Sequence, residues 1–218
     1  MQCISVSIFG DKKIYRNGLY QNLIEKELYY PNFEFHVFYD NTIDLNYLIS
    51  IEKYCHLHYG EESIPGYFWR FFLIDDKSKD LILFRDIDSR FSKRESSAVE
   101  AWKKSNKKIH IMRDHPHHNY KIMAGMWGIK GERTFSIKEK IFEFCRNNQS
   151  TINSKISDTI FLESIYDYNK NDLFVHDNWN RFNDSINFPT ERIEKNFVGE
   201  IYDEYHSKMY SYDDEIFL

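Results

Sequence analysis

The segment CISVSIF at residues 3–9 alternates apolar and small side chains and stops at Gly10, which is typical of a strand that ends in a loop. Leucine and isoleucine then recur at helical spacing across residues 19–28. A second alternating run covers residues 33–39. Because a strand, a helix and a second strand at this spacing form a βαβ unit, the segment predicts a parallel sheet.

The same alternation continues through the rest of the chain. Apolar runs predict strands at residues 81–84, 109–112, 122–127 and 173–175. Helical patterns cover residues 45–54, 67–73 and 158–166, and capping boxes at 97–100 and 136–139 begin two more helices. We expect an α/β fold with a mainly parallel central sheet and helices on both faces. Residues 1–218 would form one domain, with residues 179–218 as a C-terminal tail packed on it.

Composition and charge narrow the classes of function. Hydrophobic residues make up 42% of the 218, which indicates a globular chain. The formal net charge is -5 and no basic stripe stands out, so we expect no nucleic-acid partner. Three well-separated cysteines favour neither a disulfide framework nor a zinc ribbon. No apolar run approaches the ~18 residues of a membrane span, and we expect a soluble cytoplasmic protein.

Two carboxylates follow the apolar run at residues 81–84. Asp86 and Asp88 would lie at the carboxyl end of this buried strand, the edge where α/β sheets bind ligands. Paired oxygen ligands suit Mg²⁺ or Mn²⁺, which stabilises the departing phosphates of a nucleoside diphosphate. Two solvated aspartates at a strand-end turn, flanked by Arg85 and Arg90, would explain the triplet equally well.

Ordered motifs make the pattern more specific. RDIDSR at residues 85–90, RDHP at 113–116 and GMWG at 125–128 resemble the motif set of a group of small GT-A glycosyltransferases. Members of that group occur in bacterial polysaccharide clusters and in large DNA viruses that glycosylate their own capsids. The layout is also similar to the family 8 retaining transferases, such as glycogenin and the lipopolysaccharide galactosyltransferases. The resemblance runs from about residue 4 to residue 203 and implies a GT-A fold.

The resemblance implies a metal site and a nucleotide site. Asp86, Asp88 and His176 would hold Mn²⁺ or Mg²⁺. The residues expected around the nucleotide of a UDP-sugar are Ile8, Gly10, Tyr15, Arg70 and Ile87. Apart from the resemblance, a hydrogen-bonded histidine at a strand end accounts for His176, and an exposed loop side chain accounts for Tyr15.

Two further aspartates would face the donor sugar as catalytic residues, namely Asp114 and Asp158. Gly125 would let the sugar approach the backbone closely. Asp158 also suits a helix N-cap, and both roles can hold together. Thr159 follows Asp158 where family 8 has glutamine, so retention and inversion of configuration both stay open.

We therefore expect a metal-dependent glycosyltransferase that moves a sugar from a UDP-sugar to a glycan acceptor. In a virus it would act in the host cytoplasm. One alternative is a metal-dependent phosphohydrolase built on Asp114, His115, His117 and His118, although the intervening proline breaks any helix that could align them. Another is a non-catalytic module that binds sugar nucleotides.

Overall fold

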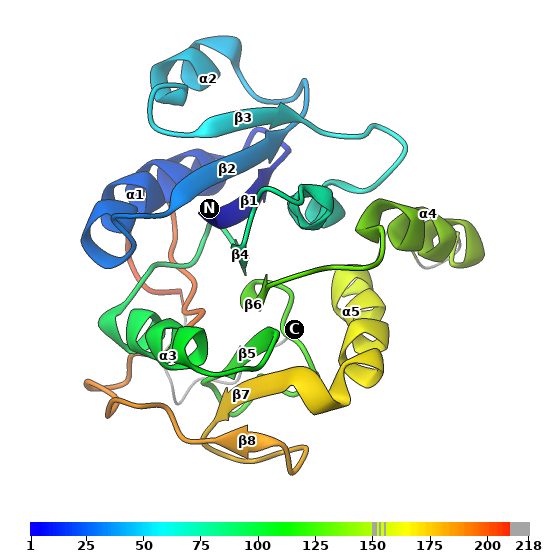
Figure 1. Ribbon diagram of the computed structural model, residues 1–218. Helices are drawn as coiled ribbons and strands as arrows, with labels where there is room; N and C mark the ends of the chain where they lie inside the picture. Colours follow the sequence, from blue (N-terminus) through cyan, green and yellow to red (C-terminus); the bar gives the residue numbers. More distant parts are fainter. Residues whose placement is uncertain (150–151, 153, 155, 210–218) are drawn as a thin grey trace.

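The central feature of the fold is a mixed β-sheet (Figure 1). In the computed structural model, which describes residues 1–149, 152, 154 and 156–209, eight strands have the order β3-β2-β1-β4-β6-β5-β7-β8. They are β1 (Gln2–Ile8), β2 (Glu34–Tyr39), β3 (His56–Tyr59), β4 (Leu81–Arg85), β5 (Ile109–Arg113), β6 (Met126–Lys130), β7 (Leu173–Asp177) and β8 (Ser185–Ile186). β6 is antiparallel to β4 and β5, and the other neighbouring pairs are parallel. The predicted α/β fold with a mainly parallel sheet is confirmed.

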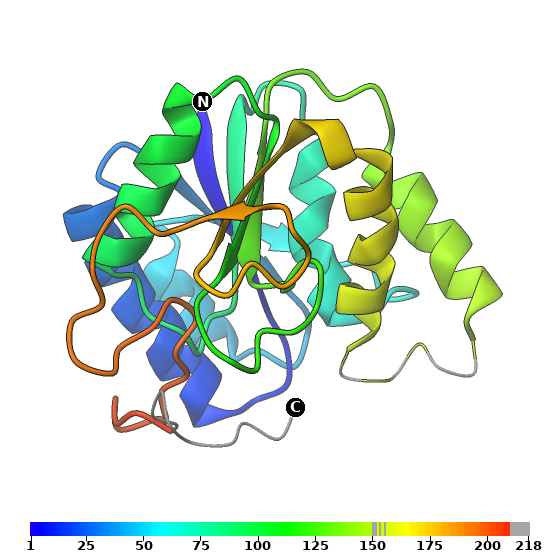
Figure 2. The ribbon, with the colours of Figure 1, turned by 90° about the horizontal axis from the view of Figure 1, so that it is seen from below.

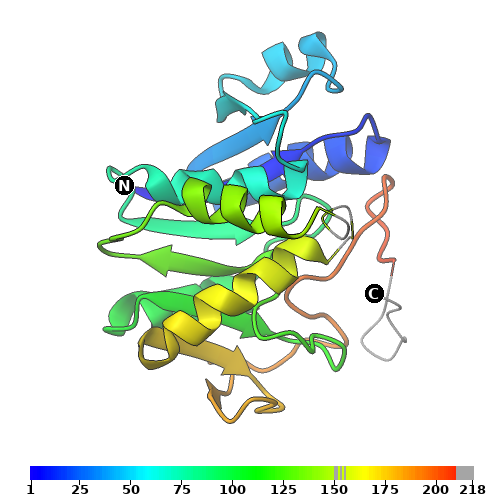
Figure 3. The ribbon, with the colours of Figure 1, turned by 90° about the vertical axis from the view of Figure 1, so that its right-hand side faces the viewer.

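Helices cover both faces of the sheet. On one face lie α1 (Lys13–Tyr29) and α3 (Lys93–Lys104), and on the other lie the 3-10 helix η1 (Gly66–Asp75), α4 (Ile137–Asn147) and α5 (Ser157–Tyr168). Figure 2 shows α3 and α5 on opposite sides of the sheet, and Figure 3 looks onto the layer of η1, α4 and α5. The shorter helices are α2 (Leu45–Ile51) and η2 (Lys170–Asp172).

β4 is buried on both of its faces, as its apolar run predicts. Leu83 belongs to the core that contains Trp102 of α3, whereas the next residue, Phe84, packs against Trp127 in the core on the η1 side. Successive side chains of a strand point to opposite faces, so one strand supplies both cores. This burial holds the end of β4 in a fixed position.

The strands β3 and β6 differ from the sequence prediction. The pattern does not predict β3, because this strand is short, rich in histidine and only partly buried at the edge of the sheet. β6 begins at Met126, since residues 122–125 lie in a turn closed by a hydrogen bond from the Met126 N–H to the Met123 carbonyl at 2.9 Å.

Helix starts are set by the serines that cap them. α3 begins earlier than predicted, because the Ser92 hydroxyl, rather than the hydroxyl of Ser97, accepts a hydrogen bond from the N–H of Glu95 at 3.1 Å. For α4 the prediction is confirmed, since the Ser136 hydroxyl accepts from the N–H of Glu139 at 3.3 Å. The helix predicted at residues 67–73 is present as η1, with 3-10 geometry.

The chain after β8 returns to the end of the sheet opposite the N-terminus (Figure 3). There the N–H of Tyr202 donates to the carbonyl of Asp88 at 2.9 Å, and Ser89 and Ile201 form an isolated bridge. Residues 210–218 of the predicted tail lie outside the described residues. In the described part of the chain, no helix has the combined length and apolarity needed to cross a lipid bilayer.

Candidate functional site

Asp86 and Asp88 lie directly after β4, at the carboxyl edge of the sheet. The strand itself is buried throughout, whereas the Asp86 side chain is 50% exposed and Asp88 is partly buried. Two cavities adjoin the pair, and Arg70, Asp86 and Asp88 line both of them. The two carboxylates therefore face open space on two sides from the end of a rigid strand.

The two cavities differ in their other walls. The first, here called the β1-side cavity, is also lined by Ser7, Phe9, Tyr15, Tyr67 and Ile87. The second, here called the β6-side cavity, has an apolar wall formed by Met123, Ala124, Met126, Phe197 and Ile201. Its polar side chains, besides the three shared residues, are His118, Tyr120, Asp158 and Thr159.

Arg70 joins Asp86 to Asp158 between the two cavities. Its Nη1 donates to Oδ1 of Asp86, and its Nη2 donates to Oδ2 of Asp158 at 2.8 Å. Two serines of β1 hold the backbone around the arginine: the Ser5 hydroxyl donates to the Arg70 carbonyl at 2.7 Å, and the Ser7 hydroxyl accepts from the Arg70 N–H at 3.0 Å. The small residues of the first strand thus position the guanidinium.

The site holds more negative than positive charge. Burial and the nearby Asp86 raise the pKa of Asp88 to about 6. Burial also raises the pKa of Asp158, against the opposing effect of Arg70. Burial alone would lower the pKa of Arg70, but the two carboxylates that it contacts outweigh burial and raise it. Three carboxylates around one guanidinium leave a deficit of positive charge, which a bound cation would supply.

The donor set of the aspartate pair fits Mg²⁺ or Mn²⁺. Both side chains offer carboxylate oxygens, the ligands that these hard cations prefer. Within the described residues, no third histidine, cysteine or carboxylate ligand lies close enough to form a group with Asp86 and Asp88. Such cations commonly complete their coordination with water and phosphate oxygens, so two protein ligands suffice.

Gly125 makes room for Asp86. A Cβ atom at this position would overlap the Asp86 carboxylate. The buried Arg85 holds the glycine in place, because its Nη1 donates to the Gly125 carbonyl at 2.8 Å and its Nη2 pairs with Oε2 of Glu95 at 2.9 Å. Gly125 does line the β6-side cavity, but the close approach that we predicted for a sugar is made by the aspartate.

The predicted Ile8 is not the residue through which the end of β1 lines the β1-side cavity. Ile8 is fully buried in the core on the α1 side, and its side chain does not line the β1-side cavity. Its neighbours Ser7 and Phe9 line the cavity instead. The predicted residue and the two lining residues differ by one position along the chain, and successive side chains of a strand point to opposite faces of the sheet.

The remaining residues predicted at the nucleotide divide into two groups. Tyr15, Arg70 and Ile87 line the β1-side cavity. Gly10 does not line it. This glycine forms the turn after β1 with a φ of 72°, and its N–H donates to the Thr42 hydroxyl at 2.7 Å.

His176 does not lie with the aspartates. Its side chain is 1% exposed in β7, and its Nδ1 is 2.8 Å from Nε2 of His110 on the neighbouring β5. Phe188 packs against the ring, and His176 lines neither cavity. The structure does not bring His176 to the aspartates, because the sheet encloses the imidazole and pairs it with a second histidine.

Replacing His176 with asparagine should make the protein less sensitive to acid. Burial lowers the pKa of His176 from 6.5 to about 4 and lowers that of His110 well below its ordinary range. The unfolded chain therefore binds protons at higher pH than the folded one, so this stability is complete above about pH 6.5 and is lost as the pH falls toward 4. We expect His176 to account for about 3 kcal/mol of that loss.

The free energy of unfolding, measured in urea between about pH 7 and 4, tests this prediction. The asparagine amide can still reach His110, which keeps the local hydrogen bond. The variant should show a shallower loss of stability on acidification. A pH dependence equal to that of the parent would contradict the account of this buried pair.

Asp114 is fully buried and anchors the C-terminal segment. Its Oδ2 accepts hydrogen bonds from Nε of Arg94 at 2.8 Å and from the N–H of Val198 at 2.9 Å, and its Oδ1 accepts from Nη2 of Arg192 at 2.8 Å. It lines neither cavity. Because these bonds occupy both carboxylate oxygens, the structure gives Asp114 an anchoring role and does not bring it to either cavity.

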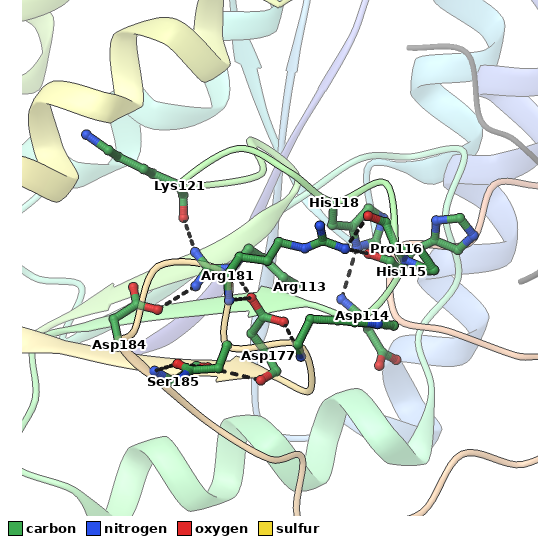
Figure 4. A network of polar contacts seen from close by, with 12 residues as sticks. Arg113, Asp114, His115, Pro116, His118, Lys121, Asp177, Arg181, Asp184 and Ser185 are labelled. Atoms are coloured by element: carbon green, nitrogen blue, oxygen red, sulfur yellow. Dashed lines mark hydrogen bonds and ion pairs between the residues drawn. The ribbon is translucent and has the colours of Figure 1, made fainter.

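The loop after β5 carries the histidines that suggest a hydrolase (Figure 4). Nδ1 of His118 accepts from the N–H of Asp114 at 3.0 Å, and Nδ1 of His115 accepts from the N–H of His117 at 3.1 Å. Among the described residues, these side chains do not form a group able to hold a metal. The phosphohydrolase alternative therefore lacks a set of metal ligands among the described residues. His118 lines the β6-side cavity, a position that the sequence pattern does not indicate.

Another group of possible metal ligands lies at the amino ends of β1 and β2. Ligand atoms of Cys3, Glu34 and His36 lie within 4.8 Å of one another. Nζ of Lys79 contacts Oε2 of Glu34 at 2.7 Å, and this hydrogen bond is the main reason that the pKa of Glu34 falls to about 2. Because the lysine already supplies the positive charge, we interpret the group as a partly buried ion pair.

Comparison with known proteins identifies the fold. No protein-family model matches the chain, and no curated protein matches its sequence. The chain is similar to the galactosyltransferase LgtC in complex with donor and acceptor sugar analogues, at 14% identity and a TM-score of 0.53, over 81% of this chain and 73% of that one. It is also similar to Staphylococcus aureus TarS 1–349 in complex with UDP, at 15% identity and a TM-score of 0.52, over 82% and 58% of the two chains.

A third similar structure is the glycosyltransferase GlyE of Streptococcus pneumoniae TIGR4, at 12% identity and a TM-score of 0.53. The match covers 83% of this chain and 47% of GlyE, so the chain spans less than two thirds of TarS 1–349 and of GlyE. At these identities the likeness establishes the fold. The chain has the GT-A glycosyltransferase fold, as the resemblance in its motifs implies.

Proposed function

We propose that this protein is a metal-dependent glycosyltransferase that moves a sugar from a UDP-sugar to a glycan acceptor. The observation that carries the proposal is the meeting of two cavities at Asp86, Asp88 and Arg70. The donor's diphosphate would lie at this junction. Its nucleotide would occupy the β1-side cavity, and its sugar would occupy the β6-side cavity.

The walls of the two cavities suit these occupants. Phe9, Tyr15 and Tyr67 give the β1-side cavity aromatic surface for a planar base. The β6-side cavity combines an apolar wall with a few polar groups, as is typical of sites for small organic ligands. Two similar structures of the same fold were solved with UDP and with donor and acceptor sugar analogues.

The residues at the junction have complementary roles in this proposal. Asp86 and Asp88 would hold Mn²⁺ or Mg²⁺, which when bound supplies Lewis-acid stabilisation of the departing diphosphate. Arg70 adds a fixed positive charge beside the aspartates, and its ion pair with Asp158 orients it. Asp158 also faces the β6-side cavity, where the donor sugar would lie.

Transfer assays with radiolabelled UDP-sugars, Mn²⁺ and a panel of glycan acceptors test the proposal. We expect labelled product that depends on both the acceptor and the divalent cation. Release of inorganic phosphate without an acceptor would indicate a hydrolase. UDP binding without turnover of any donor would indicate a non-catalytic module, and either result would contradict the proposal.

A further inference from the structure

His118 is a buried imidazole on the wall of the β6-side cavity. It lies in the loop between β5 and β6 and is 5% exposed. The rings of His115 and Phe197 pack against it, with centroids 5.6 Å and 5.7 Å away. The loop and the C-terminal segment therefore hold the imidazole in one orientation.

The backbone determines which ring nitrogen of His118 carries the proton. The N–H of Asp114 donates to Nδ1 of His118 at 3.0 Å, so Nδ1 is the acceptor and the proton of the neutral ring lies on Nε2 (Figure 4). Burial, reinforced by His115 and nearby arginines, lowers the pKa of His118 well below its ordinary range and keeps the ring neutral. The ion pairs of Asp114 with Arg94 and Arg192 fix this donor in turn.

The Nε2–H of His118 belongs to a side chain that lines the β6-side cavity. No residue in the described part of the chain accepts a hydrogen bond from it, and the atom is not among the fully enclosed unpaired polar atoms. Asp158, across the same cavity, is already bound to Arg70. A ligand with a hydroxyl group in the β6-side cavity would supply the missing acceptor.

We propose that His118 donates its Nε2–H to a hydroxyl of the transferred sugar and thereby selects the donor. The inference rests on the proposed function, because it requires a sugar in the β6-side cavity. A neutral imidazole that already holds its proton on Nε2 cannot take the acceptor's proton there, so His118 determines specificity and does not act as the base. A deoxy sugar would leave this buried donor unpaired and would be disfavoured.

Two substitutions separate the functions of the two ring nitrogens. His118→Asn places an amide near Nδ1, where its oxygen can accept from the Asp114 N–H, but leaves no donor near Nε2. His118→Gln reaches the Nε2 position with its NH₂ group and keeps the donor. The parent and both variants are assayed with the preferred UDP-sugar and its monodeoxy analogues, and their affinity for UDP alone is measured.

We expect the asparagine variant to lose about 10- to 100-fold in kcat/KM with the full sugar. It should also lose the parent's discrimination against one monodeoxy analogue. The glutamine variant should keep most of that discrimination, and UDP alone should bind equally to all three proteins. In the parent, nitrogen-15 chemical shifts should show a protonated Nε2 and an unprotonated Nδ1.

A purely structural role for His118 predicts the opposite order of kcat/KM. The asparagine variant would then be close to the parent and the glutamine variant would be impaired. Both variants would keep the parent's discrimination against the monodeoxy donor. That order, or a protonated Nδ1, would overturn the inference. So would discrimination that changes only for deoxy acceptors. These results leave the parent active and so affect this inference alone, whereas a parent that binds no UDP and transfers no sugar removes the proposed function as well.

Discussion

Replacing Asp88 with asparagine should lower kcat/KM for sugar transfer by about 1,000-fold or more, because a divalent cation is worth several kcal/mol to a departing diphosphate. The same change should preserve or raise the melting temperature. Burial and Asp86 raise the folded-state pKa of Asp88, so its charged form destabilises the folded protein at neutral pH, and a neutral amide relieves this cost. Transfer kinetics and thermal melts measure the two effects.

Asp167→Asn is the matched control for this prediction. Asp167 lies on the exposed surface of α5, where it pairs with Lys121 and Lys170, and it lines neither cavity. Its substitution should leave transfer unchanged. An Asp88 variant that is as active as this control would contradict the metal site, and one that is inactive because it is unfolded would indicate a structural role.

Asp114→Ala should lower the free energy of unfolding by about 3–5 kcal/mol and the melting temperature by roughly 10 °C. The substitution leaves Arg94 and Arg192, which are 9% and 15% exposed, without their carboxylate partner. It also removes the acceptor for the Val198 N–H and so loosens the segment that carries Phe197. Transfer should therefore fall together with stability.

Urea unfolding of Asp114→Ala and of Asp167→Ala compares a buried ion pair with an exposed one. Removing the exposed pairs of Asp167 should have little effect on the free energy of unfolding. Equal losses in the two variants would show that Asp114 does not anchor the C-terminal segment.

Much of the sheet could be predicted because buried parallel strands appear in the sequence as short apolar runs. β1, β2, β4, β5 and β7 lie close to their predicted positions, and Asp86 and Asp88 follow β4 as expected. The pattern does not predict β3, because an edge strand with histidines has no such apolar run. The predicted start of β6 lies too early, because the turn before this strand is also apolar.

The site was harder to predict because its contacts join distant residues. Nothing near Arg70 in the sequence reveals that it pairs with Asp158, 88 positions later. Asp114 stands in a motif that resembles a sugar-binding region, yet one of its partners is Arg192, 78 positions later. A local pattern shows which side chains are polar, whereas the fold decides which of them already have partners.

His176 and His118 also show that a local pattern does not reveal where a side chain lies in the fold. The resemblance assigns His176 to the metal, but the neighbouring strand β5 brings His110 against it, and both imidazoles are buried. The sequence pattern offers His118 only as a ligand of a possible phosphohydrolase, whereas in the fold the loop after β5 brings it to the wall of the β6-side cavity. One available signal was the occurrence of histidines in both β5 and β7, which indicates a buried pair when the two strands are neighbours.

The affinity for UDP with and without Mn²⁺ tests the central claim most directly. Calorimetric titration of the parent should show UDP binding that is at least about 10-fold tighter with Mn²⁺ than after chelation, since the cation links the aspartates to the diphosphate. Asp86→Ala and Asp88→Asn should each remove that gain. The same affinity with and without the cation, or an Asp86→Ala variant that binds UDP with Mn²⁺ as tightly as the parent, would contradict the account.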